Sequence, residues 1–258
     1  MSENTAGQQD EQGRDEEQAP GLQPLDETGI ERILLVVAHP DDIEYGTSAA
    51  VAGWTSRGIG VGYLLLTAGE AGMQRPPREA GPLRTEEQRR AGEAVGIERL
   101  AILDFPDGTL EYGLPLRRAI AREIRGYRPD AVVAGSGDLF VGWGIDHPDH
   151  RAAGLAAIDA VRDADNRWVF PELTSDDELE PWGATWLLLT GRAPTHYVAV
   201  DEEAEARAVA SLEAHEAYLA DLPWHPKPAD FIPEILAGTG KAAGVPRAVG
   251  FDVHRLRG

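Results

Sequence analysis

The 258-residue chain contains no cysteine, and this absence excludes several kinds of site at once. Without thiols the chain can form no disulfide, no thiolate zinc site and no cysteine nucleophile. Any metal must therefore be held by histidine, aspartate or glutamate. A cysteine-free chain is also compatible with the cytoplasm, which is the compartment we predict.

Positive charge and long apolar runs are scarce as well. Lys and Arg together number 24 against 44 Asp and Glu, which gives a formal net charge of −20. Such a chain is repelled by phosphate backbones and by anionic membrane surfaces, so we predict neither nucleic acid nor a membrane as a partner. No stretch approaches the roughly 20 continuous apolar residues of a membrane span. The N-terminus lacks the basic and apolar regions of a secretory signal.

The first 30 residues are rich in Gln, Glu, Asp and Gly and have almost no large apolar side chains. They cannot bury enough surface to offset the entropy lost on ordering, so we predict a disordered acidic tail over residues 1–30. A solubilising role is the simplest interpretation of this tail, and a docking or regulatory role is the alternative. Residues 31–258 contain no internal repeat and no linker, and they are predicted to form one domain.

Buried strands and amphipathic helices alternate along the predicted domain. We predict strands at 32–38, 61–68, 99–105, 130–135, 185–191 and 195–201, helices at 43–58, 84–96, 114–129, 147–163 and 202–222, and a long loop at 69–83. This order favours an α/β fold with a mostly parallel central sheet flanked by helices. Ligands of such sheets bind beyond the carboxyl ends of the strands, so we expect residues 39–46, 69–83 and 136–150 to converge on one crevice.

The segment HPDD, residues 39–42, ends the first predicted strand. Pro40 suits the first position of a helix, and one helical turn would bring His39 and Asp42 to the same side. An imidazole and a carboxylate placed there can share a cation. The alternative is a helix cap, because Asp near a helix N-terminus is favoured by capping and by the helix dipole.

The segment HPDH, residues 147–150, repeats this pattern after another predicted strand. His39, Asp42 and one histidine of the second motif would supply two nitrogens and one oxygen and leave a position open for water. That arrangement is typical of a catalytic zinc, although iron(II), nickel or cobalt would accept the same donors. Asp41 would then lie beside the metal, where it could accept a proton from the attacking water.

The two motifs in this order resemble the LmbE-like, or PIG-L, family of metal-dependent de-N-acetylases. The likeness extends to the segments TAGEAG, LRTEEQRRAGEAVGI, LDFPDG and AHEAY, and so over nearly the whole predicted domain. It implies a Rossmann-like three-layer fold, zinc as the usual metal, and hydrolysis of an N-acyl amide, often on an N-acetylglucosamine unit.

The resemblance also implies roles for particular residues. The metal ligands would be His39, Asp42 and His150, and Asp41 would be the general base. His147 would assist the tetrahedral intermediate or protonate the leaving amine. Arg84 matches an arginine that contacts substrate.

The sequence departs from the family pattern near the second motif. Some members place a tyrosine two residues before its first histidine, where this chain has Ile145, and this weakens the analogy with sugar–inositol deacetylases. Nearby, Trp143 and Phe140 favour an apolar or stacking surface for a sugar face or a larger aglycone, with loop packing as the alternative. Glu70, at a predicted strand end, is a candidate for contacting substrate or for orienting a ligand.

We therefore predict a zinc-dependent hydrolase that removes an N-acetyl group from an amino-sugar-containing small molecule. The first alternative is a metal-dependent amidase that acts on a larger conjugate or a specialised metabolite. The second is a binding protein on an inactive hydrolase scaffold, which the complete set of ligands and base disfavours. The predicted partner is a small N-acylated substrate, and the sequence leaves a homo-oligomer open.

Overall fold

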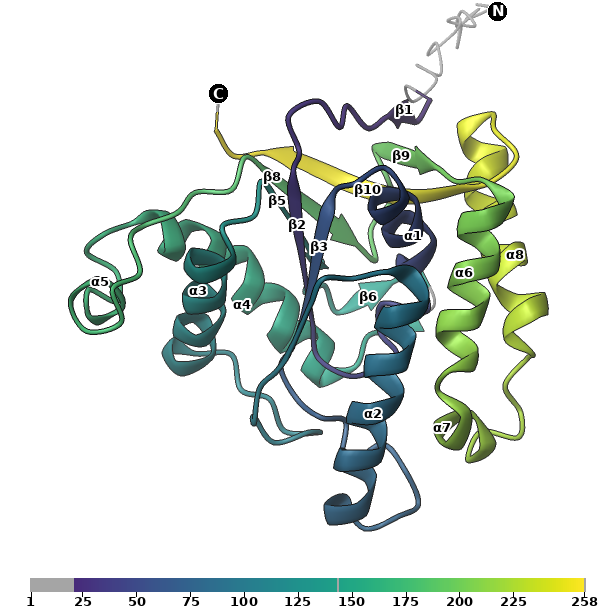
Figure 1. The fold of residues 1–258 in the computed structure, drawn as a ribbon, viewed down its shortest axis with the longest axis horizontal. Helices are drawn as coiled ribbons and strands as arrows, with labels where there is room; N and C mark the ends of the chain where they lie inside the picture. Colours follow the sequence, from purple (N-terminus) through teal and green to yellow (C-terminus); the bar gives the residue numbers. More distant parts are fainter. Residues whose placement is uncertain (1–20, 143, 258) are drawn as a thin grey trace, which may run out of the picture.

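A computed structural model of the chain describes residues 21–142 and 144–257. The main sheet contains the strands β1 Gln23–Pro24, β2 Arg32–Val37, β3 Gly60–Leu65, β4 Arg99–Ile102, β5 Ala131–Gly135, β8 Trp186–Thr190, β9 His196–Ala199 and β10 Ala248–Arg255. Their order across the sheet is β1-β9-β10-β8-β5-β2-β3-β4 (Figure 1). Strands β8, β5, β2, β3 and β4 are mutually parallel, whereas β10 is antiparallel to both β8 and β9. The predicted mostly parallel sheet is thus confirmed.

Helices cover both faces of this sheet (Figure 1). They are α1 Ser48–Ser56, α2 Pro77–Val95, α3 Leu114–Tyr127, α4 Pro148–Asp165, α5 Glu172–Ser175, α6 Glu202–Glu213, α7 Glu216–Ala220 and α8 Pro228–Ala243. Helices α3 and α4 lie on one side of the sheet, and α1, α2, α6 and α8 lie on the other. The predicted three-layer α/β arrangement is therefore confirmed.

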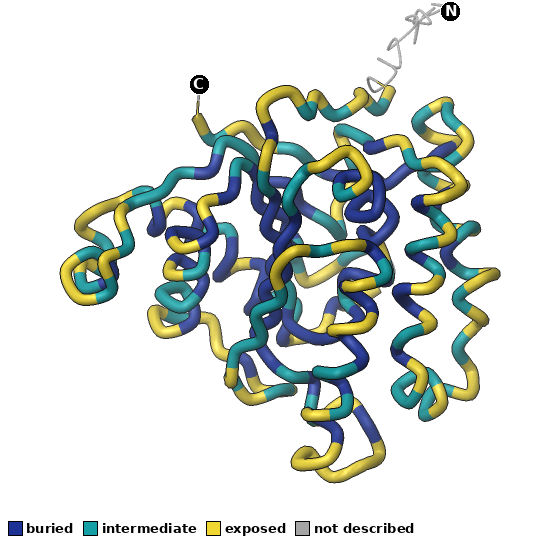
Figure 2. The backbone as a smooth tube through the Cα atoms, viewed as in Figure 1, coloured by how far each residue is buried: buried dark blue, intermediate teal, exposed yellow. Residues whose placement is uncertain are grey.

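Strand β2 shows why its sequence is a continuous apolar run. Its side chains alternate between the two faces, so Ile33 and Leu35 join the core under α1, α6 and α8, while Leu34 and Val36 join the core under α3 and α4. Both faces are buried, as expected for a central strand of a parallel sheet. Figure 2 shows the result as a buried centre surrounded by more exposed helices and loops.

Two predicted helix boundaries are wrong. Helix α1 begins at Ser48 rather than near residue 43, because residues 40–47 form turns in which Asp41 has a positive φ of 82°. Pro40 therefore lies in a turn and not at the start of a helix. Helix α2 begins at Pro77, inside the predicted loop, since proline suits the first helical position.

The predicted helix at 202–222 is two helices, α6 and α7, which are separated near His215. Helix α8, strand β10 and a small hairpin were not predicted from the sequence. The hairpin is formed by β6 Phe140–Val141 and β7 Gly144–Ile145. This hairpin lies directly before the second motif, between β5 and α4.

Part of the segment predicted as a tail packs on the domain. Strand β1 pairs with β9, Ile30 is buried, and Glu27 accepts a hydrogen bond of 2.8 Å from the Trp54 indole. Residues 1–20 lie outside the described residues, so an acidic tail there stays a prediction, as does the division into a tail and one domain.

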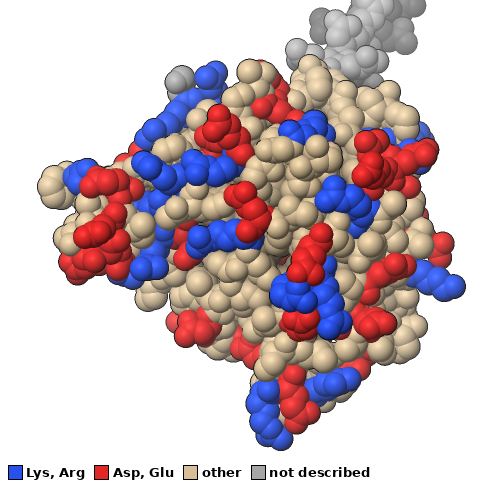
Figure 3. All heavy atoms as spheres, viewed as in Figure 1, with Lys and Arg blue, Asp and Glu red and all other residues tan. Residues whose placement is uncertain are grey.

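The surface carries both signs of charge. On the face drawn in Figure 3, basic side chains lie among acidic ones. Ion pairs of the described residues include Arg118 with Glu172 and Arg122 with Asp177. Within residues 21–142 and 144–257, no helix combines the length and the apolar character that a membrane span requires.

Candidate active site

A pocket of about 340 Å³ lies beyond the carboxyl ends of the parallel strands. Its lining comes from the turn after β2, the loop after β3, the loop after β4, the start of α4, and the helices α2 and α7. The lining residues are His39, Asp41, Asp42, Tyr45, Ala71, Gly72, Arg84, Asp107, Gly108, His147, His150 and Tyr218. The expected convergence of three segments is confirmed, and α7 and the loop after β4 complete the wall.

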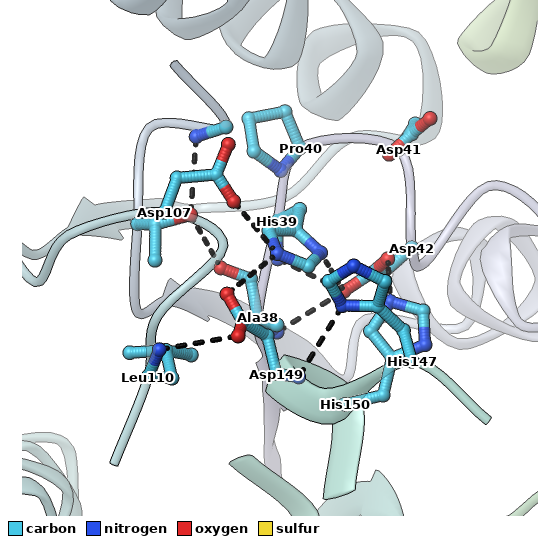
Figure 4. A network of polar contacts seen from close by, with 12 residues as sticks. Ala38, His39, Pro40, Asp41, Asp42, Asp107, Leu110, His147, Asp149 and His150 are labelled. Carbon is cyan, nitrogen blue, oxygen red and sulfur yellow. Dashed lines mark hydrogen bonds and ion pairs between the residues drawn. The ribbon is translucent and has the colours of Figure 1, made fainter. Parts of the chain in front are cut away.

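Asp42, in the lining of this pocket, lies between two imidazoles (Figure 4). One carboxylate oxygen is 3.1 Å from Nε2 of His150, and the other is 3.7 Å from Nδ1 of His39. The second oxygen also accepts hydrogen bonds from the backbone N–H groups of Ala38 and His39, which closes the turn. One ligand atom from each of His39, His147 and His150 lies within 4.8 Å of the others. The three predicted ligands, His39, Asp42 and His150, lie close together. His147, which was predicted in another role, belongs to the same group of closely spaced ligand atoms.

Three further carboxylates orient these histidines. Asp146 Oδ1 is 3.0 Å from Nδ1 of His150, and His39 Nε2 is 2.9 Å from Asp107 and 3.3 Å from Asp149. Because Nε2 of His39 faces these acids, its Nδ1 is the nitrogen on the side of Asp42. Carboxylates that hold the second nitrogen of a ligand histidine are a common feature of metal sites.

His39, Asp107 and Asp149 form another group of closely spaced ligand atoms. The carboxylate of Asp149, however, already accepts hydrogen bonds from the N–H groups of Gly108 at 2.7 Å and Leu110 at 3.1 Å. We therefore interpret this group as a support for His39 and for the loop after β4. This role of Asp149 was not predicted, although the residue stands inside the second motif.

The electrostatics of the cluster favour a cation. Burial lowers the pKa of His39, but hydrogen bonds to Asp107 and Asp42 raise it to about 11 overall. Burial likewise lowers the pKa of His150, and the charge of Asp42 raises it to about 9 overall. Burial raises the pKa of Asp42, yet His150 and His39 hold it well below its usual value. Imidazole nitrogens and a carboxylate oxygen suit a divalent transition metal, which would replace the protons on the two rings.

Asp41 points away from this cluster, as Figure 4 shows. It is buried, and its Oδ1 accepts a hydrogen bond of 3.0 Å from Nη2 of Arg84. Burial raises the pKa of Asp41 to about 6, although the Arg84 charge opposes the shift. Asp41 has a left-handed backbone, and the side chains of Asp41 and Asp42 point in different directions. The helical turn that was predicted to place His39 and Asp42 on one side is not formed here.

Arg84 reaches the pocket from α2, is buried, and donates hydrogen bonds through both of its terminal nitrogens. It donates to the carbonyl oxygens of Gly69 at 2.9 Å and Pro40 at 2.7 Å, as well as to Asp41, and it lies 4.2 Å from the ring centre of Tyr218. The contact with Asp41 makes Arg84 a support for that carboxylate. Tyr218, in the segment AHEAY, was not predicted as a pocket residue.

His147 caps the N-terminus of α4 and faces the pocket. Its Nδ1 accepts a hydrogen bond of 3.2 Å from the N–H of Asp149. Burial and the nearby His150 and His39 lower its pKa, so the ring favours the neutral form. In a neutral ring whose Nδ1 accepts, the proton is on Nε2, which is then a donor.

The remaining predicted residues have different positions. Glu70 accepts a hydrogen bond of 2.9 Å from the N–H of Asp107, so it holds the loop after β4 and is absent from the pocket lining. Trp143 lies outside the described residues. Ile145 and Phe140 face each other across the hairpin and are 71% and 70% exposed.

An α/β fold that gathers histidines and carboxylates at the carboxyl edge of its sheet defines a class of proteins built around a metal site. Residues 34–161 match the sequence model of the PIG-L family, described as GlcNAc-PI de-N-acetylase, and this part of the chain belongs to that family.

Curated relatives agree with this assignment, and a solved structure has the same fold. The chain is 36% identical over 136 residues to a diacetylchitobiose deacetylase of Thermococcus kodakarensis, covering 51% of this chain and 49% of that protein. It is 34% identical over 137 residues to a probable N-acetyl-α-D-glucosaminyl L-malate deacetylase of Bacillus anthracis, covering 50% and 58%. The chain thus spans about half the length of the curated relatives it matches. The fold matches that of N,N′-diacetylchitobiose deacetylase from Pyrococcus horikoshii with a TM-score of 0.77 at 22% identity, over 89% of this chain and 85% of that one.

Proposed function

We propose that this protein is a metal-dependent hydrolase that removes an N-acetyl group from an amino-sugar-containing small molecule. The observation that carries the proposal is one pocket holding a His–Asp–His cluster and, separate from it, the buried carboxylate of Asp41. The names of the relatives, which are deacetylases of N-acetylglucosamine compounds, support the same substrate class.

His39, Asp42 and His150 would hold the metal, with zinc as the usual choice and iron(II), nickel or cobalt compatible with the same donors. A divalent metal supplies Lewis acidity, which polarises an amide carbonyl and lowers the pKa of a water molecule to about 7. Amide hydrolysis needs a strong nucleophile near neutral pH, and a water molecule with a lowered pKa would supply it.

The other pocket residues move protons and stabilise charge. Asp41 accepts the proton of the attacking water, and Arg84 keeps its carboxylate in place. The Nε2–H of His147 donates to the carbonyl oxygen as negative charge develops on it. The leaving amine then takes the proton that Asp41 accepted from the water.

A second candidate is a metal-dependent amidase that acts on a larger conjugate or a specialised metabolite. The pair Phe140 and Ile145 favours it, because these apolar side chains are exposed and come shortly before His147 of the pocket in the sequence, where they would suit an apolar substituent. A cytoplasmic location and a homo-oligomer stay predictions of the sequence.

Acetate release by metal-loaded protein tests the proposal. N-acetylglucosamine, diacetylchitobiose and N-acetylglucosamine conjugates are the substrates, and Asp41→Asn with its full metal content is the control. Mass analysis of the products separates release of acetate from release of a larger acyl group. The proposal fails if metal-loaded protein turns over no N-acylated amino sugar.

A further inference from the structure

Asp41 has a backbone conformation that residues other than glycine rarely adopt. Its φ of 82° lies in the left-handed region, where the side chain crowds the backbone. Aspartate tolerates this region better than most residues, but such strain persists only where the surroundings enforce it. Contacts from the rest of the fold must therefore keep the backbone of Asp41 in this conformation.

Arg84 and Gln88 lie four residues apart on one face of α2, and both form hydrogen bonds with the backbone of the turn that contains Asp41. Arg84 donates to the carbonyl oxygen of Pro40 at 2.7 Å. Gln88 Oε1 accepts the backbone N–H of Asp41 at 2.9 Å, within the protein interior. Gln88 is 1% exposed, so solvent does not compete for this hydrogen bond.

The orientation of the Gln88 amide is fixed by a second contact. Its Nε2 donates to Oε1 of Glu44 at 3.2 Å, and the same oxygen accepts from Ser211 Oγ at 3.0 Å. Because the backbone N–H of Asp41 can only donate, the amide turns its oxygen toward Asp41, and its NH₂ therefore faces Glu44. Glu44 and Ser211 are both buried.

We propose that Gln88 is a positioning residue that holds Asp41 in its left-handed conformation and so aims the carboxylate into the pocket. The inference depends on the proposed function, in which Asp41 is the general base. The partners of Gln88 in the contacts above are the backbone N–H of Asp41 and the carboxylate of Glu44, and neither is a metal donor. Loss of Gln88 therefore affects the base and leaves the metal cluster in place.

Gln88→Met tests this role because methionine has a similar length and forms neither hydrogen bond. We expect kcat to fall at least ~10-fold, since small misplacements of a catalytic group are costly, while KM changes less than ~3-fold. The bound metal per protein stays that of the wild type. Ser211→Ala is the matched control: it removes the other hydrogen bond to the same oxygen of Glu44 and keeps the Gln88–Asp41 contact.

Hydrogen exchange at the Asp41 amide gives a readout that needs no turnover. In Gln88→Met this amide exchanges at least ~10-fold faster, whereas the amides of Leu34 and Leu35 in β2 keep the wild-type rate. In Ser211→Ala all three keep the wild-type rate. If the wild-type protein hydrolyses no substrate, the proposed function fails while this measurement still decides the role of Gln88.

Gln88→Asn provides the same test if the methionine variant does not fold, because its shorter amide cannot span both partners. An unchanged kcat and an unchanged Asp41 exchange rate would overturn the proposal. So would a loss of metal, or faster exchange throughout the protein, since either result would show that Gln88 supports the whole structure rather than one turn.

Discussion

At the scale of single residues, the site depends on different surroundings for two neighbouring carboxylates. Asp42 lies between His39 and His150, whereas Asp41 lies against Arg84. Each motif is a short run of adjacent residues, so the sequence alone predicts His39, Asp42 and one histidine of HPDH as metal ligands. The choice of His150 rests on the family resemblance. The φ of Asp41 could not be predicted, because it depends on side chains of α2 that lie more than 40 residues further along the chain.

Substitution of the two carboxylates should therefore have different effects. Asp42→Ala removes the oxygen donor between the two imidazoles, so metal content falls and activity falls with it. Asp41→Asn keeps the metal and lowers kcat by at least ~100-fold, because it removes the proton acceptor. Metal analysis of the purified variants beside acetate-release kinetics checks both expectations. Equal metal loss in the two variants would contradict this separation of roles.

Arg84 should affect kcat more than KM. Its guanidinium is occupied by Gly69, Pro40 and Asp41, so Arg84→Met releases the base and leaves substrate contacts largely intact. We expect at least a ~10-fold loss of kcat with a smaller change in KM. Steady-state kinetics on one N-acetylglucosamine substrate makes the measurement. A rise in KM at constant kcat would instead support the substrate contact implied by the family resemblance.

At the scale of secondary structure, strands were easier to predict than helix ends. The central strands are buried on both faces and appear as continuous apolar runs, so their predicted positions agree closely with β2, β3 and β5. Helix α2 was predicted to begin at residue 84 because Pro and Gly dominate residues 76–82. Its first turns are helical nonetheless, with Ala80 buried in the fold. Tertiary packing here outweighs local composition.

Helix α4 carries His150 and packs closely on the end of β5 through Gly154. A Cβ atom at this position would lie 2.6 Å from the carbonyl oxygen of Gly135 and from the N–H nitrogen of Gly137. Gly154→Ala must displace the helix from the backbone, so we expect a loss of about 1–3 kcal/mol in the free energy of unfolding and weaker metal binding. Denaturant unfolding and metal titration measure the two effects.

Gly238→Ala on α8 is the matched control, because a Cβ atom there meets nothing within 4 Å. Alanine is the better helix former, so this variant should gain roughly 0.5–1 kcal/mol. A Gly154→Ala variant as stable as the wild type would show that α4 moves away from β5 without cost.

At the scale of the whole molecule, the fold gathers negative charge that a cation would offset. The chain has a net charge of −20, and Asp42, Asp107, Asp146 and Asp149 all lie on the histidine cluster. The cluster forms only when the end of β2 meets the start of α4, so the unfolded chain cannot reproduce it. Metal binding should therefore stabilise the folded state specifically.

This linkage predicts a thermal shift. At a free metal concentration about 100 times Kd, binding adds about 2.7 kcal/mol to the free energy of unfolding. In a domain of this size each kcal/mol raises Tm by roughly 2–4 °C, so zinc added to chelator-treated protein should raise Tm by about 5–10 °C. Calorimetry with and without zinc measures the shift, and Asp42→Ala is the control that should show little of it. A shift of equal size in Asp42→Ala would place the stabilising metal elsewhere, because that variant lacks the oxygen donor shared by His39 and His150.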